Sequence, residues 1–378
     1  MNRSRRLLAP ASLLLATLAC GSASAQGQGA TTTAPASAGP VLAPVTAVTE
    51  LAAGDGWLVW SVPVKGGWGL EGRHAGVDRP LKVAPRPQPF DASVGTDARG
   101  GAVVTFSRCS TTPGVLIGLG DINPLRGRGC RAHVFDLSTN RESVPPIPRP
   151  ADASDTTPAM WHGRIAFGRV DLHAHGQVEQ VLLWTPGRAT LRSLPHGALP
   201  TDCPFSAGCQ GQVRQGGVEG LAYNGTLVSF LWHPVAPGVI GDAGWEVRAD
   251  TVADGRSHLV GSGFAGEACT GGDDLYAPSP PLLEGTEVRF IALESSCYVF
   301  DSPFVQISAT SGGDGQSATL KGIVLALAED GSTFYALEAP KPASETDPSC
   351  STALPCEIEQ VEPPRLRPQT RKPGSPFF

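Results

Sequence analysis

One short pattern recurs along the chain and limits its fold more than any other feature. The pattern is an extended lead-in, a tight turn at glycine, and a strand in which large apolar residues alternate with small or polar ones. Its clearest copy is Asp155–Val170, where a turn at Trp161-His162-Gly163 precedes the alternating Ile165 and Phe167. Other copies occupy 50–62, 91–108, 218–232 and 274–293. Five copies of one supersecondary unit predict a repeat protein.

A second pair of strands follows each good copy, so the repeat is a four-stranded antiparallel unit. The turns of these second pairs are Gly76-Val77-Asp78, Ser138-Thr139-Asn140, Pro186-Gly187 and Asp254-Gly255. Equivalent aromatic residues stand at Trp60, Phe106, Phe167, Phe230 and Phe290, and Tyr335 is a sixth apolar position of the same kind. Between Cys297 and Gly322 the pattern is less clear, and the last two units can be divided in more than one way.

Composition agrees with short strands joined by turns. The chain has 46 Gly and 35 Pro among 378 residues, together about a fifth, which is well above the average share. The formal net charge is -6, and Lys and Arg do not cluster outside the N-terminal segment and the extreme C-terminus. This charge distribution argues against a nucleic-acid-binding surface.

The N-terminus has the layout of an export signal. Residues 1–25 contain a basic start, an apolar run from Leu13 to Ala19, and a cleavage site at Ala23-Ser24-Ala25. An alternative is lipidation of Cys20, which would anchor the protein at a membrane. We expect a signal peptide at 1–25, a flexible linker at 26–45, the folded domain at 46–362 and a disordered tail at 363–378. No later run is long enough to span a bilayer, so we expect a periplasmic, extracellular or cell-surface location.

Cysteine usage also indicates an oxidising compartment. Eight cysteines remain after Cys20 is set aside, which is an even number. Their placement in loops favours sequential pairing, although spacing alone leaves many connectivities open. The expected disulfides are Cys109 with Cys130, Cys203 with Cys209, Cys269 with Cys297, and Cys350 with Cys356.

The clearest repeat resembles that of a known family. Asp155, Pro158, Gly163 and Ile165-Ala166-Phe167 are similar to the repeat of TolB-like six-bladed β-propellers. The other copies match less well, because Asp91 lacks the Pro and Glu219 replaces the Asp. The resemblance covers about residues 48 to 340 and implies an all-β propeller, most simply of six four-stranded blades. Stacking blades around an axis buries both faces of each sheet and protects its edges. Either the strand near Val45 or the stretch CEIEQV is expected to close the ring.

The acidic residue that begins each repeat is the best candidate for a site. In a propeller, Asp91, Asp155, Glu219 and Asp274 would gather near one mouth of the central channel, where they could hold a cation such as calcium or meet a basic ligand. The alternative is that each carboxylate accepts backbone N–H groups in its own loop. No other metal site or cofactor is predicted, since His173 and His175 lack an obvious third ligand.

No catalytic motif emerges from the sequence. The chain lacks a Gly-x-Ser-x-Gly elbow, and nothing in the pattern brings a Ser, a His and an Asp together. We therefore expect an exported, non-catalytic β-propeller that binds a protein, a glycan or another ligand, or serves as a scaffold. The alternative is a propeller enzyme with its active site at the channel mouth, such as a glycan-active hydrolase or lyase.

Overall fold

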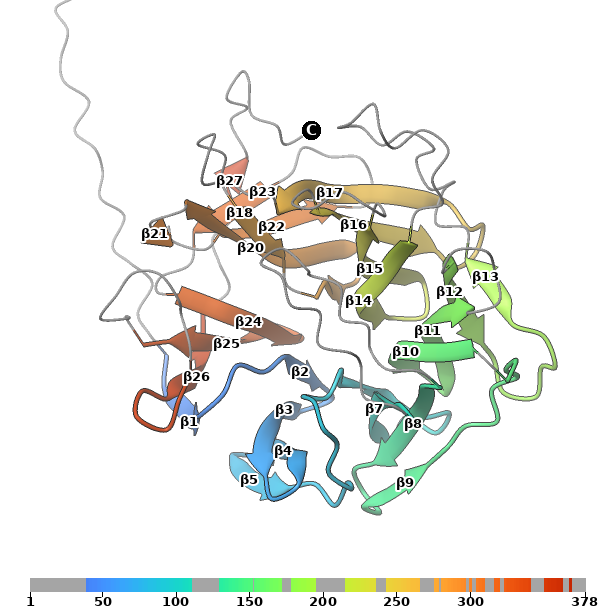
Figure 1. Cartoon of the computed structure of the whole chain (residues 1–378), viewed down its shortest axis with the longest axis horizontal. Helices are drawn as coiled ribbons and strands as arrows, with labels where there is room; N and C mark the ends of the chain where they lie inside the picture. Colours follow the sequence, from blue (N-terminus) through green and yellow to red (C-terminus); the bar gives the residue numbers. More distant parts are fainter. Residues whose placement is uncertain are drawn as a thin grey trace, which may run out of the picture. The chain divides into compact units, whose positions relative to one another are not determined.

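The computed structural model describes residues 39–110, 129–151, 153–171, 178–194, 215–235, 243–265, 275–278, 280–296, 299–300, 304–309, 316–319, 323–340, 350–362 and 367–368. Within these ranges every regular element is a strand, and the strands form six antiparallel sheets. All six belong to one compact unit, Ala36–Phe378 (Figure 1).

Five sheets have four strands each, and in four of these the strands lie in the order in which they occur along the chain. Sheet I consists of β2 (Leu51–Gly54), β3 (Trp57–Val64), β4 (Gly67–His74) and β5 (Val77–Pro80). Sheet II consists of β6 (Ser93–Thr96), β7 (Ala102–Arg108), β8 (Arg131–Asp136) and β9 (Arg141–Ser143). Sheet III consists of β10 (Ala153–Trp161), β11 (Arg164–Asp171), β12 (Val178–Trp184) and β13 (Arg192–Leu194). Sheet IV consists of β14 (Gln215–Tyr223), β15 (Leu227–Val235), β16 (Ala243–Thr251) and β17 (Ser257–Ala265).

The last two sheets include strands from the two ends of the described chain. Sheet V runs β18 (Leu275–Pro278), β20 (Glu287–Ser296), β22 (Phe304–Ala309), β23 (Gln316–Thr319) and β27 (Arg367–Pro368), while β19 (Leu282–Glu284) and β21 (Val299–Phe300) also pair with β20. Sheet VI runs β24 (Ile323–Asp330), β25 (Thr333–Ala339), β26 (Cys356–Val361) and β1 (Val41–Val45). Strand β27 lies within the expected tail, and β1 lies before the expected domain boundary at residue 46.

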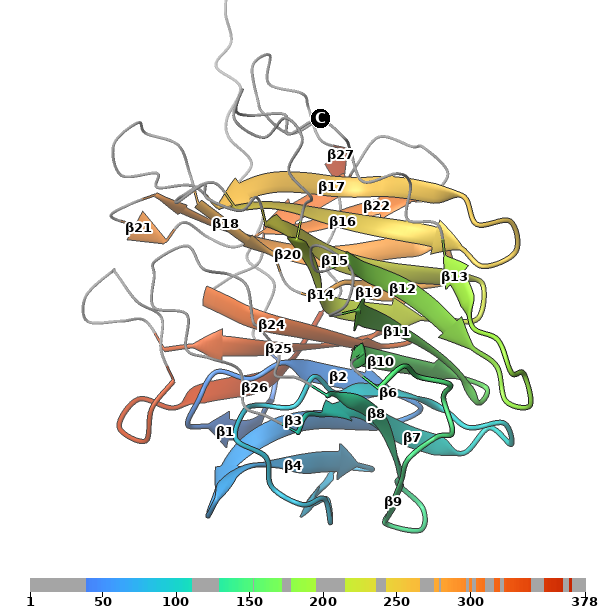
Figure 2. The same cartoon turned by 45° about the vertical axis from the view of Figure 1, so that its right-hand side comes forward.

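A separate apolar core lies between each pair of neighbouring sheets. Six such clusters join sheets I and II, II and III, III and IV, IV and V, V and VI, and VI and I. The last pair completes the circle, so the fold is an all-β propeller with four-stranded blades, as the repeat predicted. In Figure 2, sheets that are consecutive in the chain lie side by side.

The recurring aromatic residues explain why these repeats stack. Trp60, Phe106, Phe167, Phe230 and Phe290 all lie on the second strand of their sheet, and none is more than 2% exposed. A large ring on the second strand fills the space between two sheets, where neither face meets water. In sheet VI the buried aromatic residue on β25 is Phe334, whereas Tyr335 is only partly buried.

The ring is closed by pairing between the start and the end of the domain. Strand β1 pairs antiparallel with β26, with Val45 opposite Cys356 and Val41 opposite Glu359. Both stretches that the sequence left as alternatives for closure therefore take part, as partners of each other.

Two of the expected disulfides are present. Cys109 is bonded to Cys130 and Cys350 to Cys356, which indicates an oxidising compartment. The expected pairs Cys203–Cys209 and Cys269–Cys297 lie outside the described residues, as do His173 and His175. In the part of the chain that the structure describes, no helix is long and apolar enough to cross a membrane.

Candidate functional site

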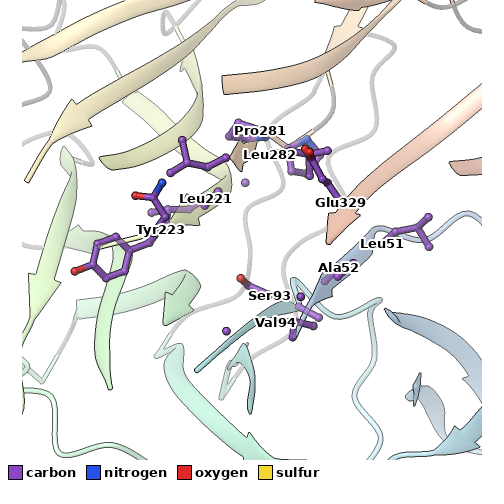
Figure 3. A pocket seen from close by; sticks show the side chains of 18 of the residues that line it. Leu51, Ala52, Ser93, Val94, Leu221, Tyr223, Pro281, Leu282 and Glu329 are labelled. Atoms are coloured by element: carbon purple, nitrogen blue, oxygen red, sulfur yellow. The ribbon is translucent and has the colours of Figure 1, made fainter. Parts of the chain in front are cut away.

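A cavity of about 270 Å³ lies where the first strands of five sheets and β19 of sheet V come together. Its walls are formed by β2, β6, β10, β14, β19 and β24 with the turns that follow them, and by the Pro280-Pro281 stretch before β19. Among the described strands, the first strand of each sheet has one edge without a partner strand. Figure 3 shows side chains from these strands around the cavity, with Ser93 and Val94 on one wall and Leu221 and Tyr223 on another. Every sheet thus contributes to one site.

The charged side chains around the cavity are all acidic. They are Glu50, Asp55, Asp91, Glu284, Glu329 and Asp330, and no Lys, Arg or His is among the described residues that line the cavity. The remaining wall is largely apolar, with two aromatic residues, Trp161 and Tyr223. A cavity with this lining favours cationic or neutral ligands over anions.

Asp91, one of the predicted site residues, lines this cavity, but both oxygens of its buried side chain are hydrogen-bonded within the protein. Its Oδ1 accepts the backbone N–H of Ser107 (3.0 Å) and pairs with Arg86 (2.9 Å). Its Oδ2 accepts the hydroxyl of Ser107 (2.7 Å) and the backbone N–H of Thr157 in the next sheet (2.9 Å). Thr157 has a φ of 45°, because the register of β10 against β11 shifts here and turns its N–H toward Asp91. Asp91 therefore joins sheets II and III.

Asp155 is held in a buried ion pair within its own sheet. Its oxygens bind Nε and one terminal nitrogen of Arg169 at 2.6 and 3.0 Å, and the Asp155 side chain is 2% exposed. Burial raises the pKa of Asp155, against the opposing effect of Arg169. Asp155 is not among the residues that line the cavity.

The other two predicted acids have no described side chain. Glu219 lies on β14 at a register shift between Val218 and Gly220, and Asp274 lies outside the described residues. The structure therefore brings Asp91 to the cavity and leaves a shared cation site of the four acids as a prediction. Among the described residues, no group of three or more His, Cys, Asp or Glu is arranged to hold a metal ion.

Sequence reasoning missed a second set of acids at the C-terminal ends of β2, β19 and β24. Asp55, Glu284 and Asp330 each stand directly before a glycine of positive φ, where these strands turn into β3, β20 and β25. Glu329 is one residue further back. The available signal was the acid-glycine pair that ends each of these three strands.

Glu329 is the most unusual group in the cavity wall. Its side chain is only 4% exposed, and Oε1 pairs with Arg289, whose other terminal nitrogen binds Glu287 at 2.7 Å. Its Oε2 is buried and has no hydrogen-bond partner among the described residues. Burial raises the pKa of Glu329 to about 7, and the nearby Glu284 and Glu287 act in the same direction against Arg289. In Figure 3 this side chain lies beside Leu282 of the neighbouring sheet.

Comparison with solved structures finds proteins of several activities. An α-L-arabinofuranosidase from Lactobacillus brevis is 12% identical, with 85% of this chain and 91% of that chain covered and a TM-score of 0.37. The β-propeller domain of the Trilobed protease from Pyrococcus furiosus is 9% identical, with coverages of 87% and 97% and a TM-score of 0.39. A GH93 α-L-arabinofuranosidase of Fusarium graminearum is 9% identical, with coverages of 84% and 93% and a TM-score of 0.41.

No protein-family model matches the chain, and neither does any curated protein. Glycosidases, peptidases and neuraminidases all occur among the similar structures, at identities of 12% or less. One propeller scaffold supports many activities, so these similarities do not select a function. The chain belongs to the class of β-propellers with a central cavity, on the evidence of its own sheets and cores.

Proposed function

We propose that this protein is an exported, non-catalytic β-propeller that binds a ligand or a partner's side chain in its central cavity. The observation that supports this most directly is the cavity itself, which is lined by all six sheets with an apolar wall and acidic groups. Sites of this kind, concave and mostly apolar with a few polar groups, are the usual place for ligands in a protein. The proposal includes the TolB-like assignment and a signal peptide at 1–25. The two disulfides support export to an oxidising compartment.

The experiment compares ligand binding by the wild type with that of a variant whose cavity is filled. Ser93 lines the cavity, and Ser93→Trp places a large ring there. A library of small metabolites, sugars and peptides is screened by thermal shift against both proteins. We expect ligands that raise the Tm of the wild type and leave Ser93→Trp unchanged, and no covalent change of these ligands by mass spectrometry. Ligands that stabilise both proteins equally would place binding elsewhere.

A glycan-active enzyme is the second candidate, because one observation favours it. Glycoside hydrolysis commonly uses two carboxyl groups, one of which stays protonated near neutral pH. Glu329 has a pKa raised to about 7 and lines a cavity that also contains Asp55 and Asp330. Release of reducing sugar from an oligosaccharide, lost in Glu329→Gln, would support this function over the non-catalytic one.

A further inference from the structure

We propose that the ligand of the central cavity carries an alkylammonium group, and that its N–H groups bind Oε2 of Glu329. This inference rests on the proposed binding function and specifies the chemistry of its ligand. It depends on three features of the described residues: an unsatisfied buried oxygen, the charge around it, and the shape of the wall.

The first feature is the oxygen itself. Oε1 of Glu329 is occupied by Arg289, whereas Oε2 is buried without a donor among the described residues. Leaving a buried carboxylate oxygen unpaired costs on the order of 1 to 3 kcal/mol. A ligand N–H delivered through the cavity would satisfy this oxygen. The only free acceptor on Glu329 is a single oxygen, which suits an ammonium group better than a guanidinium, whose two parallel N–H groups need both oxygens.

The second feature is charge. Glu329, Arg289 and Glu287 form a chain of two carboxylates and one guanidinium, so with both acids ionised the group has a net charge of -1. Every other ionisable residue that lines the described cavity is also acidic. One positive charge on the ligand would neutralise the Glu329 group, and the surrounding acids would attract it. Burial raises the pKa of Glu329, and the nearby Glu284 and Glu287 raise it further against Arg289, so the pair with Arg289 does not fully compensate this carboxylate.

The third feature is the rest of the cavity wall. Leu282 lies beside Glu329 (Figure 3), Leu327 also lines the cavity, and Trp161 and Tyr223 line it from sheets III and IV. An alkyl chain gains from contact with such a surface, and an ammonium group is attracted to aromatic faces. A bare metal ion would find no third ligand, because no cluster of metal-binding side chains is present in the described ranges.

The test uses small amines as probes of this site. Binding of n-pentylamine and 1,5-diaminopentane to the full mature protein is measured by calorimetry at pH 8, with 1-pentanol and pentanoate as neutral and anionic controls. We expect both amines to bind and the controls to bind at least tenfold more weakly. Glu329→Gln removes the charge and keeps the shape, and should weaken amine binding at least tenfold. The matched control is Glu246→Gln, which removes a carboxylate from a similar ion pair, with Arg248, outside the cavity wall and should bind as the wild type does.

Two results would overturn the inference: equal binding of the amines and 1-pentanol, or amine binding that Glu329→Gln leaves unchanged. If Glu329→Gln does not fold, as judged by circular dichroism, Ser93→Trp decides instead, and retained amine binding by that variant rejects the site. If neither amine binds but the screen finds other ligands that Ser93→Trp no longer binds, only the alkylammonium class of ligand is rejected. Absence of any Ser93→Trp-sensitive ligand would reject the binding function as well.

Discussion

At the scale of single residues, the carboxyl groups of three aspartates are buried among the strands. Asp91 accepts hydrogen bonds from two sheets, Asp155 pairs with Arg169 inside one sheet, and Asp250 is completely buried on β16. Each was recognisable in the sequence as an acid, but its partner was not. The predicted alternative, in which the recurring acids accept local N–H groups, describes part of what Asp91 does, since one of its donors comes from the next sheet.

We predict that Asp91→Ala destabilises the protein by about 3 to 5 kcal/mol, because it leaves Arg86, the backbone N–H of Thr157 and Ser107 without their acceptor in a buried place. Urea denaturation followed by tryptophan fluorescence measures the change. Asp97→Ala is the control, since Asp97 accepts N–H groups only within its own exposed turn and should lower the free energy of unfolding by about 1 kcal/mol. Equal effects of the two substitutions would contradict this role of Asp91.

Asp250 gives a prediction about pH. Burial raises its pKa to about 7, against the weaker opposing effects of Ser257 and Arg248. The folded protein therefore holds a proton that the unfolded chain releases near pH 4, so this contribution to stability is complete below pH 4 and is lost as pH rises to about 7. The loss amounts to at most about 4 kcal/mol.

The measurement is urea unfolding of the wild type and Asp250→Asn at pH 5 and pH 8. The amide stays neutral, so the variant should lose much less stability between the two pH values and should exceed the wild type at pH 8. The contribution of Glu329 has the same sign and is common to both proteins. Parallel pH profiles for the two proteins would show that Asp250 does not titrate in this range.

At the scale of elements, the first strands of neighbouring sheets approach each other closely at the cavity. A Cβ atom on Gly95 of β6 would lie 2.0 Å from the carbonyl oxygen of Met160 on β10. A Cβ on Gly220 of β14 would lie 2.4 Å from Cβ of Pro280. Glycine thus sets how near the strands can come, and with it the width of the cavity.

We predict that Gly95→Ala lowers the free energy of unfolding by about 2 to 3 kcal/mol, because the backbone of β10 must move to avoid the new methyl group. Thermal melts of this variant should show a clear drop in Tm. Gly101→Ala is the matched control, since a Cβ there meets nothing closer than 3.4 Å. An unchanged Tm for Gly95→Ala would mean that the two strands can separate at no cost.

The disulfide that follows β7 closes one loop of the chain. Cys109 and Cys130 are 21 residues apart, and closing a loop of this length stabilises the fold by about 3 kcal/mol. We predict that replacing both cysteines by serine lowers the free energy of unfolding by about this amount while the circular dichroism spectrum stays that of a β-protein. A loss of β-structure would instead make this disulfide a condition for folding.

At the scale of the whole domain, stability depends on closing the circle of sheets. Strand β1 covers the outer edge of β26, and Ala43 and Val45 join the core between sheets VI and I. An uncovered edge strand exposes unpaired N–H and C=O groups that can pair with another molecule.

We predict that a chain beginning at residue 48 has a Tm lower by several degrees and aggregates more, both because β26 loses its partner and because this core loses Ala43 and Val45. A chain beginning at residue 39 serves as the control and should have the Tm of the full chain. Thermal melts measure the Tm, and size-exclusion chromatography measures aggregation. Equal melts for the two truncations would contradict closure by β1.

The sequence by itself determined the repeat, the second-strand aromatic residues that fill the space between sheets, and the cysteine spacing of the two disulfides seen. These features are local, since strand alternation and turn chemistry are set by residues close together in the chain. Tertiary structure alone decided which strand closes the ring, which acids share the cavity, and that Glu329 rather than Asp155 lines it. These facts depend on residues such as Arg289 and Glu329, which are 40 positions apart and meet only when two sheets pack.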